Sequence, residues 1–316
     1  MKFKKALFIN IDKSNLGIDY WKKIDLLVGS KVFLLKDSPA IKKELYNTDC
    51  LLVAFGIPVT KDDIDNAPNL KYIGTLSTAF GKVDVDYARK KGISVCNLAG
   101  YSTESVAEFV IAVILEHIRD LEEGKYRGRE KNYSITRISA IEIKSKVFGI
   151  IGLGAIGARV AQLAQGFGAH VKYWSRNRKK DSEKKGIRYE SLDKLISEAD
   201  FLSINLAQTK ETEGIFTKGR FQKVKSGAVI VNTAPMELID INGLAARLKE
   251  NDITFILDHS DEMSEKDLVK LSKFKNCIIY PPIAFVSKEA ALTKQEMFVG
   301  NIEAYLKGKP QNVVNP

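Results

Sequence analysis

The strongest local signal in the sequence is the stretch Gly149-Ile-Ile-Gly152-Leu-Gly154-Ala-Ile-Gly157-Ala-Arg-Val-Ala. Its glycines follow the spacing Gly-x-Gly-x-x-Gly between an apolar run and a helical pattern. In such a turn Gly152 permits the tight bend, Gly154 lets the backbone approach a pyrophosphate, and Gly157 lets helix and strand pack closely. We therefore predict a strand, turn and helix that bind a dinucleotide. The alternative is a glycine-rich turn without a ligand.

Two features beside this loop concern the phosphates of the cofactor. The helix opens with Ala155 and Ile156, whose free N–H groups lie at the positive end of the helix dipole. The next strand ends at Ser175, Arg176 and Arg178, without the carboxylate that holds the ribose 2′-hydroxyl of NAD. Guanidinium groups pair with a 2′-phosphate, which a carboxylate would repel. We predict NADP(H) as the preferred cofactor, with NAD(H) also able to bind, although a solvated basic turn would look the same.

Strand-like apolar runs alternate with helical segments on both sides of the loop. One series comprises residues 6–10, 31–35, 51–55, 72–76 and 94–96. A second series begins at 146, directly before the loop, and continues with runs that begin at 170, 201, 228, 254 and 277. This alternation indicates parallel sheets with helices on their faces. We predict an α/β protein of two doubly wound domains, one flavodoxin-like and one a Rossmann domain. Helices are expected over residues 103–123 and 293–306.

Composition excludes several classes of protein. The chain has 316 residues, of which 45% are hydrophobic and 28% charged, as in ordinary globular proteins. No apolar run approaches the roughly 18–20 residues that cross a bilayer, and the apolar stretch near the start is short for a signal peptide. We therefore expect a cytoplasmic protein without a membrane partner. The net charge of +10 is spread along the chain without a nucleic-acid motif, so no nucleic-acid partner is expected. The three cysteines stand apart, so neither a disulfide framework nor a metal site is expected.

From Tyr72 onward the chain resembles the D-isomer-specific 2-hydroxyacid dehydrogenases. The matching stretches are residues 97–108, the loop at 152–157, and residues 199–206, 225–234, 255–258 and 300–315. The resemblance implies a substrate domain over 1–99 and 293–316, and an inserted dinucleotide-binding domain over 100–292. It also implies a small-molecule substrate, a homodimer, and cofactor contacts from Thr103, Thr233 and Asp258, with Asp258 binding the nicotinamide carboxamide.

The residues that catalyse the family's reaction are replaced by other residue types at the matching positions of this sequence. The family's substrate-binding arginine falls on Pro235 and its general acid, a histidine, on Pro282. The family's glutamate falls on Asp261, with Glu262 next to it. Reduction of a 2-oxoacid needs a cation for the carboxylate and a donor for the forming alkoxide, and proline offers neither. Ordinary hydroxyacid dehydrogenase activity should therefore be very weak or absent.

Four residues remain as candidates for an altered catalytic site, namely Tyr101, His259, Asp261 and Glu262. His259 follows Asp258, and on a strand the two side chains would point to opposite faces. Three hypotheses stay open. The first is an NADP(H)-dependent oxidoreductase acting on an imine or conjugated electrophile. The second is an inactive dinucleotide-binding sensor or scaffold, and the third is a 2-hydroxyacid dehydrogenase with a displaced acid/base such as His259.

Overall fold

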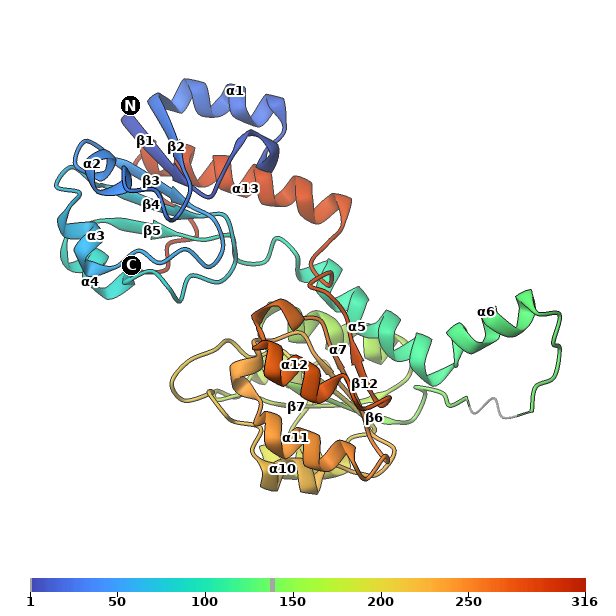
Figure 1. Cartoon of the computed structure of the whole chain (residues 1–316). Helices are drawn as coiled ribbons and strands as arrows, with labels where there is room; N and C mark the ends of the chain where they lie inside the picture. The colour runs from blue at the N-terminus through green and yellow to red at the C-terminus, as the bar shows by residue number, and fades with distance from the viewer. Residues whose placement is uncertain (1, 137–139) are drawn as a thin grey trace. The chain divides into compact units, whose positions relative to one another are not determined.

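The chain forms two compact units in this computed structural model, which describes residues 2–136 and 140–316 apart from the side chain of Glu262 (Figure 1). Unit 1 comprises Met1–Ser102 and Ser287–Pro316, and unit 2 comprises Thr103–Val286. Each unit contains one parallel sheet and its own hydrophobic clusters. No helix among the described residues is long and apolar enough to span a membrane.

Unit 1 has a five-stranded parallel sheet in the order β2-β1-β3-β4-β5. Its strands are β1 (Phe3–Ile9), β2 (Val28–Leu34), β3 (Cys50–Val53), β4 (Tyr72–Thr75) and β5 (Ser94–Cys96), and its α-helices are α1 (Ile18–Leu27), α2 (Ile41–Leu45), α3 (Lys61–Asp65), α4 (Val85–Lys90) and α13 (Lys288–Leu306). The order 2-1-3-4-5 is that of a flavodoxin-like sheet. This part of the predicted fold class is confirmed.

Unit 2 has a seven-stranded parallel sheet in the order β12-β11-β10-β9-β6-β7-β8. Its strands are β6 (Val147–Ile151), β7 (His170–Trp174), β8 (Arg188–Tyr189), β9 (Phe201–Ile204), β10 (Val229–Asn232), β11 (Thr254–Leu257) and β12 (Cys277–Ile279), and its α-helices are α5 (Thr103–Ile118), α6 (Leu121–Arg129), α7 (Ala155–Gly166), α8 (Lys180–Glu183), α9 (Leu192–Glu198), α10 (Lys218–Lys223), α11 (Ile241–Leu248) and α12 (Glu265–Leu271). This is the Rossmann order, in which the chain direction across the sheet reverses between β6 and β9. The six predicted strands are present. The seventh, β8, has two residues, too few to show a pattern.

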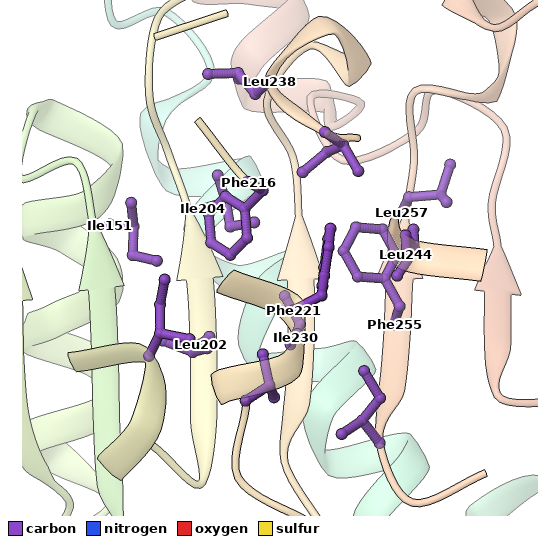
Figure 2. Packing of buried hydrophobic residues seen from close by; sticks show 14 of the residues in the cluster. Ile151, Leu202, Ile204, Phe216, Phe221, Ile230, Leu238, Leu244, Phe255 and Leu257 are labelled. Carbon is purple, nitrogen blue, oxygen red and sulfur yellow. The ribbon is translucent and has the colours of Figure 1, made fainter. Parts of the chain in front are cut away.

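The central strands of unit 2 are buried on both faces, which is why they read as continuous apolar runs. In β10, Ile230 belongs to one cluster while Val229 and Val231 belong to the other, as the alternation of a strand requires. Phe221 of α10 meets Phe255 of β11 edge to face within the first cluster (Figure 2). Strands β10 and β11 pair in parallel, with Asn232 opposite Leu257 at their carboxyl ends.

Two predicted helix bounds are wrong. The helix expected over 103–123 ends at Ile118, because Asp120 adopts φ 51°, a left-handed conformation that no helix continues through. A second helix, α6, starts directly after it. The final helix starts at Lys288 rather than near residue 293, because the Ser287 hydroxyl caps it by accepting a hydrogen bond from the Ala290 N–H at 3.0 Å.

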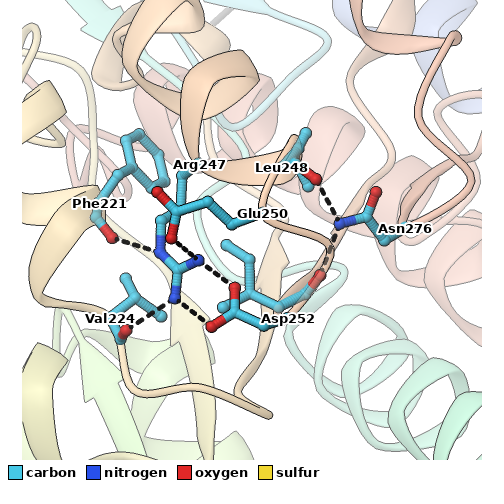
Figure 3. A network of polar contacts seen from close by, with 8 residues as sticks. Phe221, Val224, Arg247, Leu248, Glu250, Asp252 and Asn276 are labelled. Atoms are coloured by element: carbon cyan, nitrogen blue, oxygen red, sulfur yellow. Dashed lines mark hydrogen bonds and ion pairs between the residues drawn. The ribbon is translucent and has the colours of Figure 1, made fainter.

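A buried arginine fastens α10 and α11 to the turn before β11 (Figure 3). Arg247 is 5% exposed and donates to the carbonyl oxygens of Phe221 and Val224, each at 3.2 Å. The guanidinium also forms ion pairs with Asp252 and, at 2.9 Å, with Glu250. The charge is thus compensated on all sides, which a buried guanidinium requires.

Candidate functional site

The glycine-rich loop leaves open space at one position only. Gly152 has φ 95°, and a Cβ there would come within 2.7 Å of the carbonyl oxygen of Asn205. A Cβ on Gly157 would overlap the carbonyl oxygen of Gly152. A Cβ on Gly154, by contrast, would meet no heavy atom within 4 Å. Two of the glycines are therefore needed by the fold, and the third leaves room for a ligand.

Helix α7 presents its N-terminus at this open space. Gly154 is its N-cap and supplies no side chain to bind the first N–H groups. The N–H of Ala158 donates to the Gly154 carbonyl at 2.9 Å, so the preceding N–H groups, those of Ala155 and Ile156 included, lack a partner within the helix. The first turn carries no acidic residue that would repel an anion. These features fit a pyrophosphate.

The three residues predicted to recognise the 2′-phosphate differ in how firmly they are held. Ser175 is buried, and its hydroxyl donates to the carbonyl oxygen of Asn177 at 2.7 Å. Arg178 pairs with Glu183 at 2.6 Å, and its guanidinium lies 5.1 Å from the ring centre of Tyr189. The exposed Arg176 has a looser ion pair, at 3.4 Å from the Glu211 carboxylate. Breaking the existing contacts of Arg176 therefore costs less free energy than breaking those of Arg178, so Arg176 is the arginine that a phosphate could bind more easily.

The ends of β10 and β11 carry buried acceptors that the described part of the protein leaves unpaired. Asn232 lies opposite Leu257 in the sheet, so the residues that follow them, Thr233 and Asp258, leave neighbouring strands at the same edge. Thr233 Oγ1 and Asp258 Oδ1 are buried and accept no hydrogen bond from the described residues. A buried polar atom without a partner costs roughly 1–3 kcal/mol, which a ligand with N–H donors would recover. A carboxamide such as that of nicotinamide has such donors.

The second oxygen of Asp258 has a structural role. Asp258 Oδ2 accepts the Ala284 N–H at 3.0 Å, so the carboxylate anchors the segment after β12. Burial raises the pKa of the Asp258 carboxyl above its ordinary value, and the neighbouring Asp261 raises it further, while His259 opposes the shift. Thr103, the remaining residue expected to contact the cofactor, is half-buried at the first position of α5.

The two prolines offer nothing that can polarise or protonate a substrate. Pro235 precedes the short 3-10 helix Met236–Leu238. Pro282 is followed by the exposed apolar side chains of Ile283 and Phe285. Proline has neither an N–H group nor a polar side chain. The positions that resemble those of the family's arginine and histidine are thus apolar.

The predicted orientation of His259 is wrong. His259 Nε2 lies 3.8 Å from Asp258 Oδ1, so the two side chains approach one another instead of pointing to opposite faces. The alternation argument fails because β11 ends at Leu257, and His259 adopts φ −101° and ψ 42° at the start of the 3-10 helix Ser260–Glu262. An imidazole therefore lies next to the carboxylate expected to bind nicotinamide.

The other candidate residues are placed as follows. Asp261 is exposed, the side chain of Glu262 lies outside the described part of the chain, and Tyr101 belongs to unit 1. Tyr280, next to the prolines, donates its hydroxyl to Glu116 of α5 at 2.8 Å, and burial raises its pKa to about 12. Among the described residues no group of three or more His, Cys, Asp or Glu could hold a metal ion.

A Rossmann sheet with an open glycine loop, joined to a flavodoxin-like unit, defines a two-unit dinucleotide-binding protein. A family model described as the NAD-binding domain of D-isomer specific 2-hydroxyacid dehydrogenases matches residues 111–284, and the chain belongs to that family. A hydroxypyruvate reductase of Blautia hydrogenotrophica is 34% identical over 266 residues, which cover 82% of each chain. A glyoxylate reductase of Aeropyrum pernix is 33% identical over 80% of this chain and 79% of its own.

Two solved structures cover nearly the whole chain. A D-lactate dehydrogenase of Aquifex aeolicus, complexed with NAD and lactic acid, has a TM-score of 0.86 and 27% identity, covering 98% of this chain and 99% of its own. An acyclic imino acid reductase, Bsp5, in complex with NADPH and D-Arg, has a TM-score of 0.86, 29% identity and the same coverage. The suspected family is thereby confirmed.

Proposed function

We propose that the protein is an NADP(H)-dependent oxidoreductase whose substrate is an imine of a 2-oxoacid or a related conjugated electrophile. The observation that carries the proposal is the contrast between the two ends of the site. At the cofactor positions Thr233 Oγ1 and Asp258 Oδ1 accept no hydrogen bond from the described residues, while the catalytic positions hold Pro235 and Pro282. When bound, the nicotinamide supplies or accepts the hydride.

The chemistry of the substrate explains why the prolines can be tolerated. A ketone needs a proton donor at its oxygen as hydride arrives, and general acid catalysis supplies roughly 10²–10⁴-fold. A protonated imine already carries its proton, so hydride addition to carbon gives a neutral amine directly. The imino acid reductase with bound NADPH is consistent with this substrate class. The protein must still provide a group that binds the substrate's carboxylate.

One observation favours a second candidate, a 2-hydroxyacid dehydrogenase with a displaced acid. His259 Nε2 lies 3.8 Å from Asp258 Oδ1, and the imidazole is about a quarter exposed, at 24%. A carboxylate beside an imidazole stabilises its protonated form and so equips it to donate a proton. In this case a 2-oxoacid would be reduced without an amine.

Turnover by the purified protein decides between these candidates. We would follow NADPH oxidation with pyruvate alone, with pyruvate plus methylamine, which form an imine in solution, and with an enone. The proposal predicts oxidation that requires the amine or the enone and is faster with NADPH than with NADH. Oxidation with pyruvate alone that is lost in His259→Gln would support the second candidate instead. Tight NADPH binding without any turnover would favour the sensor.

We also propose that the protein forms a homodimer. In and after α6, unit 2 exposes several large apolar side chains: Leu121 is 45% exposed, Tyr126 61%, Tyr133 85% and Ile135 83%. Large apolar side chains left exposed within one short segment are consistent with an interaction surface. Light scattering should give twice the chain mass of 35.2 kDa, and a Tyr133→Lys, Ile135→Lys variant should shift the mass toward that of one chain.

A further inference from the structure

The chain that follows β12 is bound to the end of β11 by hydrogen bonds on both sides of Asp258. The Tyr280 N–H donates to the carbonyl oxygen of Leu257 at 2.8 Å, and the Tyr280 carbonyl oxygen accepts from the Ser260 hydroxyl at 3.0 Å. The Ala284 N–H donates to Asp258 Oδ2 at 3.0 Å. The chain after β12 thus contacts the residues before and after Asp258 as well as its carboxylate.

The side chain of Tyr280 links this part of the chain to helix α5. Its hydroxyl donates to Glu116 Oε2 at 2.8 Å, a charge-assisted hydrogen bond of the stronger kind. The Phe109 ring, also of α5, meets the tyrosine ring edge to face, with the ring centres 5.5 Å apart. Burial and the Glu116 carboxylate raise the pKa of Tyr280 to about 12, so the hydroxyl keeps its proton and remains a donor at neutral pH.

The residues between Tyr280 and Ala284 have little conformational freedom. Two of the three are Pro281 and Pro282, and the proline ring fixes φ. A displacement of Tyr280 is therefore passed on to the Ala284 N–H instead of being absorbed by backbone rotation. That N–H holds one oxygen of Asp258 and so sets the direction of the other, Oδ1, which is buried and accepts no hydrogen bond from the described residues.

We propose that Tyr280, held by Glu116, is a positioning residue that directs Asp258 Oδ1 toward the carboxamide of the bound nicotinamide. The inference deepens the proposed function and rests on it, since it takes Asp258 as the acceptor for the carboxamide. A hydrogen bond weakens steeply as its angle and distance depart from the preferred values, so a small rotation of the carboxylate weakens this one. All of these residues belong to unit 2, so the arrangement is complete within that unit.

A coenzyme without the carboxamide N–H groups isolates this role. In the 3-acetylpyridine analogue of NADP⁺, an acetyl group replaces the carboxamide and donates no hydrogen bond. Calorimetric titration of the wild-type protein should show NADP⁺ binding roughly 10- to 100-fold more tightly than the analogue. In Tyr280→Phe this preference should fall about 3- to 10-fold, with most of the loss in the affinity for NADP⁺. An equal loss for both coenzymes, which a purely structural role would give, overturns the proposal.

Variants of Glu116 and of a distant tyrosine complete the test. Glu116→Gln keeps an oxygen that can accept from Tyr280 and should retain most of the preference, whereas Glu116→Leu should match Tyr280→Phe. Tyr87→Phe is the matched control, because the Tyr87 hydroxyl donates to Asp65 at 2.7 Å in unit 1 and its removal should leave the preference unchanged. Thermal unfolding shows whether each variant is folded at the temperature of the titration. A full preference in folded Glu116→Leu, or a reduced one in Tyr87→Phe, contradicts the role of Tyr280.

The same titrations, combined with the turnover assay, separate this inference from the proposed function. Imine turnover by the wild-type protein, with the full preference retained in Tyr280→Phe, would overturn the role of Tyr280 and leave the function standing. A preference that falls in Tyr280→Phe, in a protein that reduces neither the imine nor the enone, would support Tyr280 and refute the function. Equal wild-type affinity for NADP⁺ and its analogue would also overturn the role of Tyr280, because no carboxamide bond would then exist to be positioned.

Discussion

Replacing Arg176 by alanine tests the predicted preference for NADP(H). A hydrogen bond to a charged group contributes roughly 1.5–3 kcal/mol. The side chains of Arg176 and its partner Glu211 are 59% and 69% exposed, so solvent screening favours the lower end. An exposed ion pair contributes about 0–1 kcal/mol, so Arg176 loses little on leaving Glu211. The net effect of about 0.5–1.5 kcal/mol predicts roughly 2- to 13-fold weaker binding of NADPH in Arg176→Ala.

The assay is a titration of each variant with NADPH and, separately, with NADH, followed by the fluorescence of the reduced nicotinamide. NADH has no 2′-phosphate, so its affinity should stay the same. Arg178→Ala is the matched comparison and should have the smaller effect on NADPH, because Arg178 is already engaged by Glu183 and Tyr189. Raised salt should weaken NADPH binding more than NADH binding. Equal losses for both cofactors in Arg176→Ala would refute the assignment.

Three further experiments test other parts of the structure. The free energy of unfolding of Gly154→Ala should lie within about 0.5 kcal/mol of the wild-type value, since its Cβ meets only open space, yet this variant should bind NADPH more weakly. Gly157→Ala should lose both stability and NADPH binding. Thermal unfolding and cofactor titration check this pair. Arg247→Met should lower the free energy of unfolding by about 2–3 kcal/mol in urea, because Asp252 and two carbonyl groups lose their partner, although the partial exposure of Asp252 limits the loss. Pro235→Arg combined with Pro282→His should create NADPH-dependent reduction of pyruvate alone; a variant that binds NADPH normally but stays inactive would show that more than these two side chains is missing.

The sequence predicts those parts of the fold that are determined by residues close together along the chain. The glycine spacing at 152–157 and the apolar runs determine a strand, a turn and a helix over short distances, and the structure has them there. Strand β8 is missed because two residues carry no periodicity. The break at Asp120 is missed because a single residue in a left-handed conformation leaves the apolar pattern of the helices around it unchanged.

Several features of the candidate site depend on contacts across the fold. The approach of His259 to Asp258 follows from the end of β11 at Leu257, because both residues then lie outside the strand and its alternation of faces. Arg178 forms an ion pair with Glu183 and lies against the ring of Tyr189. The sequence alone does not show that these side chains meet.

The buried acceptors Thr233 Oγ1 and Asp258 Oδ1 bear on whether the protein is an enzyme or a sensor. Neither atom accepts a hydrogen bond from the described residues, and either hypothesis explains this, since both require a nucleotide to bind there. Each atom opposes folding until a donor reaches it. The two hypotheses differ at Pro235 and Pro282, because a sensor needs no proton donor there and an oxidoreductase tolerates prolines only if its substrate already carries its proton. Turnover with an imine is therefore the observation that separates the oxidoreductase from the sensor.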